Sequence, residues 1–217
     1  METKNKTSWS FSSLMDYERC PHTQSFPYTK GPKQINEAAQ RGIDAHKKCA
    51  DYILHGGDAP PFIGFNWNSL VNARVEEKIG LDEDWQPTAY KTAWLKIIPD
   101  ALVVAPEGIT IIDHKTGKRE YKEIKHSQQM QLYACAINAI YTDIHAITSE
   151  LWYLDHGFKH TATYTPKKLE GMRMRFTNRA LTMLQDTEMR PKPNKSNCKF
   201  CQHNPDQGGR CEYAFQP

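Results

Sequence analysis

The sequence lacks any long apolar run: none approaches the roughly 18 residues that a membrane-spanning helix requires. The early lysines in METKNKTSWSFSS are followed by no apolar core, so no secretory signal is expected. Internal repeats and low-complexity tracts are also missing. A net charge of +3 over 217 residues is only mildly basic, so a nucleic-acid partner would need a local basic patch. These absences predict an intracellular (cytoplasmic) globular protein.

The chain does contain six cysteines, which in a reducing compartment are thiols or metal ligands rather than disulfides. Cys198-Lys199-Phe200-Cys201 has the spacing of metal ligands, and Cys211 follows it. The tail from Pro191 is too polar to fold by burial alone, so a bound metal would hold it together. Zinc bound by these three cysteines and either His203 or Cys20 is one candidate.

The hydrophobic pattern predicts an α/β fold in which helices flank a mixed β-sheet. Helices are expected at 35–54, 126–141 and 165–187, and strands at 74–80 (where helix competes), 92–104, 109–115, 147–154 and 159–164. Thr165-Pro166 favours a helix start, with proline at the first helical position. Cys49 and Cys135 fall on apolar helical faces and are expected to be buried. The expected organisation is an N-terminal segment at 1–34, a core at 35–190 and a cysteine-rich tail at 191–217.

A hairpin joins the two strands that carry the most informative residues. If the turn at Ala105-Pro106-Glu107-Gly108 is centred between proline and glutamate, cross-strand partners have numbers that add up to 213. Asp100 then lies opposite Asp113, unless a one-residue bulge breaks the register. Because side chains alternate along a strand, Asp113 and Lys115 share one face, with their backbones roughly 7 Å apart.

Two aspartates opposite each other on a ladder would have β-carbons about 5 Å apart and would repel, so one of them would bind a proton. A divalent cation between them removes that cost, and oxygen ligands suit Mg2+ or Mn2+. The backbone carbonyl of His114 adds a ligand, and Lys115 would orient or deprotonate the attacking water. In the competing interpretation, Asp100, Asp113 and Lys115 are ordinary solvated groups at strand ends.

Two helices carry further candidate site residues. His46 lies on the apolar stripe of helix 35–54, and Gln129 and Tyr133 are one turn apart on the next helix. Each has an ordinary structural explanation as well, because a histidine or tyrosine on an apolar face is often a core residue.

These residues, in this order, resemble the RecB-like branch of the PD-(D/E)XK nuclease superfamily. The resemblance is carried by His46, Pro99-Asp100, the segment 112–117 (Ile-Asp-His-Lys-Thr-Gly) and Gln129-x-x-x-Tyr133. The opening Ser10-Phe11-Ser12-x-x-x-x-Tyr17-x-x-Cys20-Pro21 is similar to that of the iron–sulfur nucleases of the CRISPR-associated and AddB-type groups. Many relatives have a glycine shortly before the first aspartate, whereas this chain has Lys96-Ile97-Ile98-Pro99.

The resemblance implies a restriction-endonuclease-like fold and a metal-dependent DNA nuclease, expected to be an exonuclease in recombination, replication or repair. It implies metal ligation by His46, Asp100 and Asp113, water activation by Lys115, and support of the site or contact with DNA by Gln129 and Tyr133. It also implies a [4Fe–4S] cluster on Cys20, Cys198, Cys201 and Cys211, although the nine residues between the last two exceed the usual gap. The small size of the chain would suit a phage or mobile element.

Basic residues follow the predicted strand 109–115. They would bind DNA phosphates without sequence preference, although such a run is often only a solvated face. They are Lys118, Arg119, Lys122 and Lys125. The expected partner is DNA, either single-stranded or with ends. A recombination or replication protein is a further expected partner, and no association with a membrane is expected. Trp9, Phe11 and Tyr17 would stack on bases or anchor the N-terminal segment. The alternative function is a non-catalytic DNA-binding module with a structural iron–sulfur or zinc site.

Overall fold

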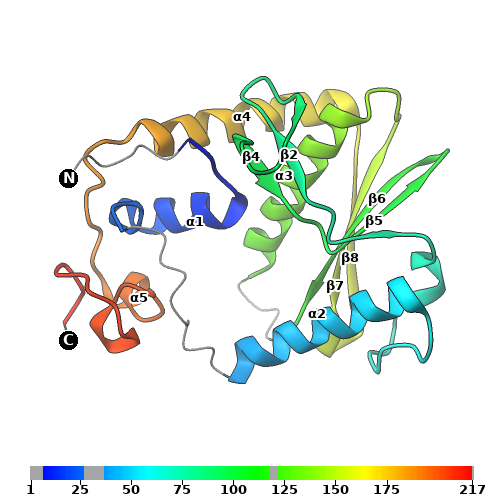
Figure 1. The fold of residues 1–217 in the computed structure, drawn as a ribbon, viewed down its shortest axis with the longest axis horizontal. Coiled ribbons are helices and arrows are strands. Elements are labelled where there is room, and N and C mark those ends of the chain that lie inside the picture. Colours follow the sequence, from blue (N-terminus) through cyan, green and yellow to red (C-terminus); the bar gives the residue numbers. More distant parts are fainter. Residues whose placement is uncertain (1–6, 27–36, 118–121, 217) are drawn as a thin grey trace. The chain divides into compact units, whose positions relative to one another are not determined.

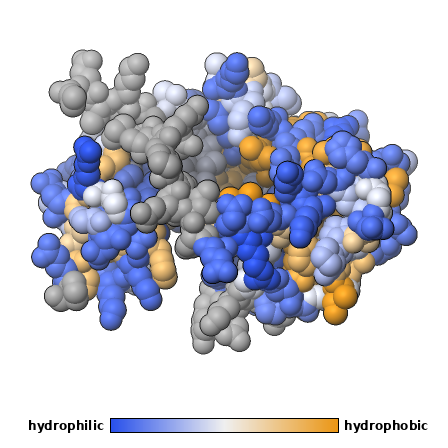
Figure 2. Space-filling model, turned by 60° about the horizontal axis from the view of Figure 1, so that its bottom comes forward, coloured by the Kyte–Doolittle hydropathy of each residue, from blue (hydrophilic) through white to orange (hydrophobic). Residues whose placement is uncertain are grey.

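The computed structural model describes residues 7–26, 37–117 and 122–216, and the chain divides into two compact units. Unit 1 comprises residues 1–35 and 177–217, and unit 2 comprises residues 36–176. Helix α4 (Pro166–Gln185) crosses that boundary. Among the described residues, no helix combines the length and the apolar character that crossing a bilayer needs. The face of the molecule in Figure 2 is largely hydrophilic, with smaller hydrophobic patches.

Unit 2 is built on a five-stranded sheet in the order β1-β5-β6-β7-β8. Figure 1 labels the strands β5 to β8 of this sheet. Its strands are β1 (Arg74–Val75), β5 (Ala101–Ala105), β6 (Gly108–Lys115), β7 (Ile147–Tyr153) and β8 (Phe158–Tyr164). The central strand β6 pairs antiparallel with β5 and parallel with β7, and the other pairs are antiparallel. The sheet is therefore mixed, which confirms the predicted fold class.

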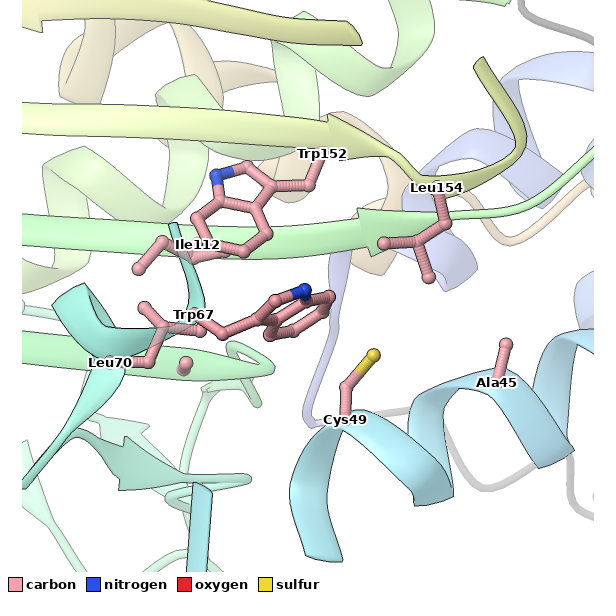
Figure 3. Packing of buried hydrophobic residues seen from close by; sticks show 8 residues of the cluster. Ala45, Cys49, Trp67, Leu70, Ile112, Trp152 and Leu154 are labelled. Atoms are coloured by element: carbon pink, nitrogen blue, oxygen red, sulfur yellow. The ribbon is translucent and has the colours of Figure 1, made fainter. Parts of the chain in front are cut away.

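Helices α2 (Glu37–His55) and α3 (Glu123–Ile140) pack on this sheet. Ala45 and Cys49 of α2 pack in one apolar cluster with Ile112 and Trp152 from neighbouring strands (Figure 3). Since strand side chains alternate, the neighbours of Ile112 on β6 point to the opposite face, and α3 contacts Asp113 on that face. The core of unit 2 thus extends on both sides of β6.

Helices were predicted closely, and α2, α3 and α4 are confirmed within a few residues at the ends that the structure describes. Helix α4 begins at Pro166, as the Thr165-Pro166 pair predicted. Cys49 and Cys135 are fully buried, which confirms their assignment as small core residues.

Two of the predicted strands are each broken, and that part of the prediction is wrong. Segment 92–104 forms two strands, β4 (Leu95–Ile97) and β5, which belong to different sheets. Pro99 lies between them, and proline cannot donate a hydrogen bond to a ladder. Segment 74–80 is similarly divided between β1 and β2 (Ile79–Leu81), because Glu76 between them has φ 47°. Strands β2, β3 (Pro87–Thr88) and β4 form a small antiparallel sheet in the order β3-β2-β4.

Unit 1 contains helix α1 (Phe11–Arg19), which the sequence pattern did not reveal. Ser10 caps its first turn, and the side chain of Ser13 returns a hydrogen bond to the Ser10 backbone. Trp9, Phe11 and Tyr17 are buried, so they anchor the N-terminal segment and are not free to stack on bases.

The remaining short helices of the two units are η1 (Pro21–Gln24), η2 (Trp67–Leu70), η3 (Leu154–His156), α5 (Lys195–Cys198) and η4 (Pro205–Gln207).

Gly80 of β2 provides a test of packing in the small sheet. A Cβ added there would lie 2.7 Å from the Ala93 Cβ and 2.9 Å from the Tyr90 Cα, so the backbone would have to move. We expect Gly80→Ala to lower the free energy of unfolding by about 1–3 kcal/mol, as overpacking does. Urea denaturation measures this change.

Gly171 in helix α4 is the matched control, because nothing lies within 4 Å of a Cβ added at that position. Gly171→Ala should raise the free energy of unfolding by about 0.5–1 kcal/mol, since alanine loses less backbone entropy in a helix. Equal effects of the two substitutions would contradict the close approach at Gly80.

Candidate functional site

The β5–β6 hairpin has the register that the sequence predicted. Ala101 pairs with Ile112 and Ala105 pairs with Gly108, so cross-strand numbers add up to 213. Asp100 directly precedes β5, at the position that this register sets opposite Asp113. Its Oδ2 accepts a hydrogen bond from the backbone N of His114 at 2.6 Å. The hairpin therefore brings Asp100 to the end of β6 that carries Asp113 and Lys115.

Asp113, Lys115 and the α3 side chains form one hydrogen-bonded network. Lys115 Nζ lies 2.6 Å from Asp113 Oδ2 and donates to Gln129 Oε1 at 3.1 Å. Gln129 Nε2 donates to Asp113 Oδ1 at 3.1 Å and to the Tyr133 hydroxyl at 2.9 Å. The Tyr133 hydroxyl in turn donates to the Ile98 carbonyl at 3.3 Å. Gln129 thus fixes the carboxylate and the ammonium relative to each other.

On the other side of the site, His46 of α2 approaches Asp100. Its Nδ1 lies 3.2 Å from Asp100 Oδ1, so α2 contributes directly to the group. The structure brings together His46, Asp100, Asp113, Lys115, Gln129 and Tyr133, all of which belong to unit 2.

The two aspartates differ in their affinity for a proton. Burial raises the pKa of Asp113 to about 6, even though the Lys115 charge opposes this shift, and the charge of Asp100 raises it further. Burial raises the pKa of Asp100 as well. The hydrogen bond from His46 and the nearby histidines outweigh this effect and hold the pKa below its ordinary value. The hydrogen bond to Asp100 raises the pKa of His46. The pKa values of the two carboxyl groups are thus shifted in opposite directions, upward mainly by burial for Asp113 and downward by the histidines for Asp100.

The ring of His114 lies in the aromatic packing beside this site. Its centroid is 6.0 Å from that of Trp67 and 5.6 Å from that of Trp152, and its Nε2 is buried without a hydrogen-bond partner among the described residues. Burial lowers the pKa of His114 to about 4, so the ring is neutral near pH 7. This packing holds the backbone between Asp113 and Lys115 in place.

Positive charge gathers at the beginning of α3. Lys122 and Lys125 are exposed, and His126 lies beside them. Burial lowers the pKa of His126 to about 4, and the charges of Lys115, Lys122 and Lys125 lower it further. The predicted DNA-binding residues Lys118 and Arg119 lie outside the described residues. The two described lysines are therefore available to a polyanion close to Lys115.

Three residues near the site were missed in the sequence. Arg41 of α2 pairs with Asp155, and Asp155 and His156 bind the backbone of Gly117, just beyond the end of β6. Their proximity depends on the parallel pairing of β6 with β7, which places Lys115 beside Tyr153. No local sequence pattern specifies that pairing.

In unit 1, Cys20, Cys198, Cys201 and Cys211 line one cavity, together with His203. Cys20 Sγ accepts a hydrogen bond from the Lys192 backbone N at 3.3 Å, and Cys198 Sγ accepts one from the Phe215 backbone N at 3.4 Å. Burial raises the pKa of the Cys211 thiol, and the charges of the other three thiols raise it further. Such mutual repulsion between thiolates is what a bound cation relieves.

The nine residues between Cys201 and Cys211 fold back on themselves. The Cys211 backbone N donates to the His203 carbonyl at 2.8 Å, which closes the segment into a loop. Asn204 is buried and ties the loop to the helix before it, since its Nδ2 donates to the Cys198 carbonyl at 2.9 Å. The long gap therefore does not carry Cys211 away from the other cysteines, because the chain returns to within two residues of the Cys-x-x-Cys turn.

In unit 2 the carboxylates are occupied by contacts with neighbouring side chains and backbone, and in unit 1 two of the cysteine sulfurs accept from backbone N–H groups. Within residues 7–26, 37–117 and 122–216, no group of three or more histidine, cysteine or acidic side chains is arranged to hold a metal ion. The chemistry of the donors still suits two different metals. Carboxylates and an imidazole suit Mg2+ or Mn2+, and thiolates suit zinc or iron–sulfur clusters.

Comparison with known proteins places these observations in a family. The family model described as "PD-(D/E)XK nuclease superfamily" matches residues 67–205, which is more than half of the chain. The solved structure titled "Crystal structure of SSO0001" is similar in fold, with a TM-score of 0.52 and 17% sequence identity over 98% of this chain and 89% of that chain. No curated protein matches the sequence significantly.

The raised pKa of Asp113 predicts how cation binding depends on pH. A cation that uses this carboxylate has to displace its proton below about pH 6, so affinity for Mn2+ should fall as the pH is lowered from 7 to 5. The expected decrease approaches about tenfold per pH unit for each proton released. Calorimetric titration with MnCl2 measures it.

Asp113→Asn serves as the control, because it cannot release a proton and should bind Mn2+ weakly at both pH values. An Mn2+ affinity of the natural protein that stays constant between pH 5 and pH 7 would contradict ligation by Asp113.

Proposed function

Because the chain belongs to the PD-(D/E)XK nuclease superfamily, we propose that it is a Mg2+- or Mn2+-dependent deoxyribonuclease that hydrolyses phosphodiester bonds. The observation that carries the proposal is the gathering of Asp100, Asp113 and Lys115 where β5 begins and β6 ends. A binding module needs no ammonium paired with a buried carboxylate at such a point. Hydrolysis does, since a base and a positive charge act on water and phosphate together.

The proposed ligands are His46, Asp100, Asp113 and the backbone carbonyl of His114. The cation would supply Lewis-acid activation of the phosphate and compensate the negative charge of the two carboxylates. The known contacts of these residues support this assignment, because His46 already lies 3.2 Å from Asp100 and the Asp100 carboxylate receives the His114 N–H. Both contacts hold the carboxylate oxygens near the end of β6.

Lys115 would hold the attacking water and take part in its deprotonation. Gln129 keeps the lysine oriented, because it accepts from Nζ at 3.1 Å while it donates to Asp113. The Tyr133 hydroxyl accepts a hydrogen bond from Gln129 Nε2 at 2.9 Å and thereby fixes the Gln129 amide. Gln129 and Tyr133 therefore act mainly by positioning, and Lys122 and Lys125 would bind the flanking phosphates.

Within this proposal the enzyme is an exonuclease that acts on DNA ends in recombination, replication or repair. The assignment is supported by the order of the motifs from His46 to Tyr133, which resembles that of RecB-like nucleases. Substrates with and without ends distinguish this mode from endonuclease action.

We expect the purified protein to degrade end-labelled linear DNA with MgCl2 or MnCl2 and to be inactive with EDTA. Covalently closed circular DNA should resist cleavage, since it offers no end. Asp113→Ala should abolish activity, and Lys115→Ala should lower the rate by about 10²–10⁴-fold, the usual contribution of a positioned acid–base group. Gel electrophoresis of timed samples measures each rate.

Lys78→Ala is the matched control for Lys115→Ala, because Lys78 is an exposed lysine of the same unit and should leave the rate unchanged. Nicking of the closed circle would replace the exonuclease assignment with an endonuclease. No cleavage of single- or double-stranded DNA in either metal would favour the non-catalytic DNA-binding module.

For unit 1 we propose that Cys20, Cys198, Cys201 and Cys211 ligate a [4Fe–4S] cluster. The cavity that the four cysteines line supports this, as do the backbone N–H groups that donate to two of the sulfurs. Hydrogen bonds to cysteine sulfur are among the features that tune such clusters. Zinc is the alternative, since His203 lines the same cavity and would complete a tetrahedral set with three cysteines.

Anaerobically purified protein should be brown, with about four irons per chain and a broad visible absorption band. Cys198→Ser should remove the band, whereas Cys49→Ser, in unit 2, should leave it unchanged. A colourless protein with one zinc per chain would exclude the cluster in favour of zinc.

A further inference from the structure

The backbone turn that follows β6 is held by side chains from another part of unit 2. Strand β6 ends at Lys115, which is the last residue in register with β7. Thr116 and Gly117 then leave the sheet, and Gly117 adopts φ 81°, a left-handed conformation. A strand end without further ladder bonds would fray unless other groups secure it.

Both polar backbone groups of Gly117 are bound by η3. Asp155 Oδ2 accepts from the Gly117 N–H at 2.5 Å, and His156 Nε2 donates to the Gly117 carbonyl at 3.0 Å. Since Tyr153 is the ladder partner of Lys115, Asp155 lies two residues beyond this pair, as Gly117 does. These two side-chain bonds continue the parallel pairing of β6 with β7 past the end of the ladder.

Helix α2 joins the same arrangement. Arg41 pairs with Asp155 Oδ1, so one carboxylate binds both the turn and the helix. One residue further along α2, a Cβ added to Gly42 would lie 3.3 Å from Thr116 Oγ1, which shows that helix and turn are in close contact. Ala45 of this helix and Leu154 of η3 belong to one buried cluster (Figure 3). His46 follows directly on α2.

We propose that Asp155 is a positioning residue that joins the Thr116–Gly117 turn to α2 and thereby sets the spacing between Lys115 and His46. Asp155 contacts neither of these two side chains in the described contacts; it acts through the backbone that carries them. An error of about 1 Å in the position of a reacting group lowers rates by about 10²-fold, so this spacing matters for cleavage. The inference rests on the proposed nuclease function for its kinetic consequence.

Three substitutions separate the two contacts of Asp155. Asp155→Ala removes both and should lower kcat for linear DNA by about 10–100-fold with KM little changed. Asp155→Asn keeps an oxygen acceptor for Gly117 and should recover part of that loss. Arg41→Ala removes only the ion pair and should have an intermediate effect. The matched control is Lys159→Ala, which breaks the 2.9 Å ion pair to Glu150 on the same sheet, away from the turn, and should leave kcat unchanged.

A second readout does not depend on catalysis. Hydrogen–deuterium exchange followed by mass spectrometry should show faster exchange in peptides that contain Gly117 in Asp155→Ala, and no change there in Lys159→Ala. An Asp155→Ala protein with natural kcat, or with natural exchange at Gly117, would overturn the proposal. If the natural protein cleaves no DNA, the proposed function fails, and the exchange experiment still decides whether Asp155 holds the turn. Should Asp155→Ala not fold, Asp155→Asn and Arg41→Ala carry both measurements.

Discussion

A carboxylate that is only 3% exposed, Asp113 on the central strand, is the constraint to which much of unit 2 responds. An isolated charge in such a position is strongly unfavourable, so it must be paired, hydrogen-bonded or protonated. Lys115 pairs with it, Gln129 donates to it, and its pKa remains raised to about 6. These compensations leave the carboxylate with a raised affinity for a proton. A buried carboxylate with a shifted pKa is typical of a functional site, and the proposed divalent cation would compensate its charge.

The same constraint accounts for the aromatic packing and the hydrogen bonds that surround the site. A buried ion pair contributes little net stability, because desolvation offsets the attraction between its charges. When the geometry relaxes, that attraction is lost and the desolvation cost remains. The aromatic packing of Trp67 and Trp152 around His114, and the chain from Gln129 through Tyr133 to the Ile98 carbonyl, limit such relaxation. Elements on both faces of β6 therefore contribute to one site, α2 through His46 and α3 through Gln129.

The parts of this site that the sequence predicted depend on short-range geometry. A two-residue hairpin connection makes the register of β5 and β6 a matter of counting, which is why Asp100 could be matched to Asp113. Helical spacing likewise puts Gln129 and Tyr133 on one face. Pro99 was visible too, and its missing N–H should have divided segment 92–104 into two strands. Helix α1 was missed because its cap, a reciprocal Ser10–Ser13 pair, lacks the usual glutamate or glutamine.

What could not be predicted depends on pairing between segments distant in the sequence. Asp155 reaches Gly117 only because β6 and β7 run parallel, and a parallel pair joined through a helix has no turn whose length sets its register. The return of Cys211 to His203 is of the same kind, since the loop closes through a backbone bond that no residue pattern announces. Chemically distinctive residues such as Asp113 and Cys198 can therefore be proposed as site residues from the sequence. The residues that contact the neighbouring backbone, Asp155 at Gly117 and Asn204 at Cys198, are ordinary in type and are identified only by the contacts that folding creates.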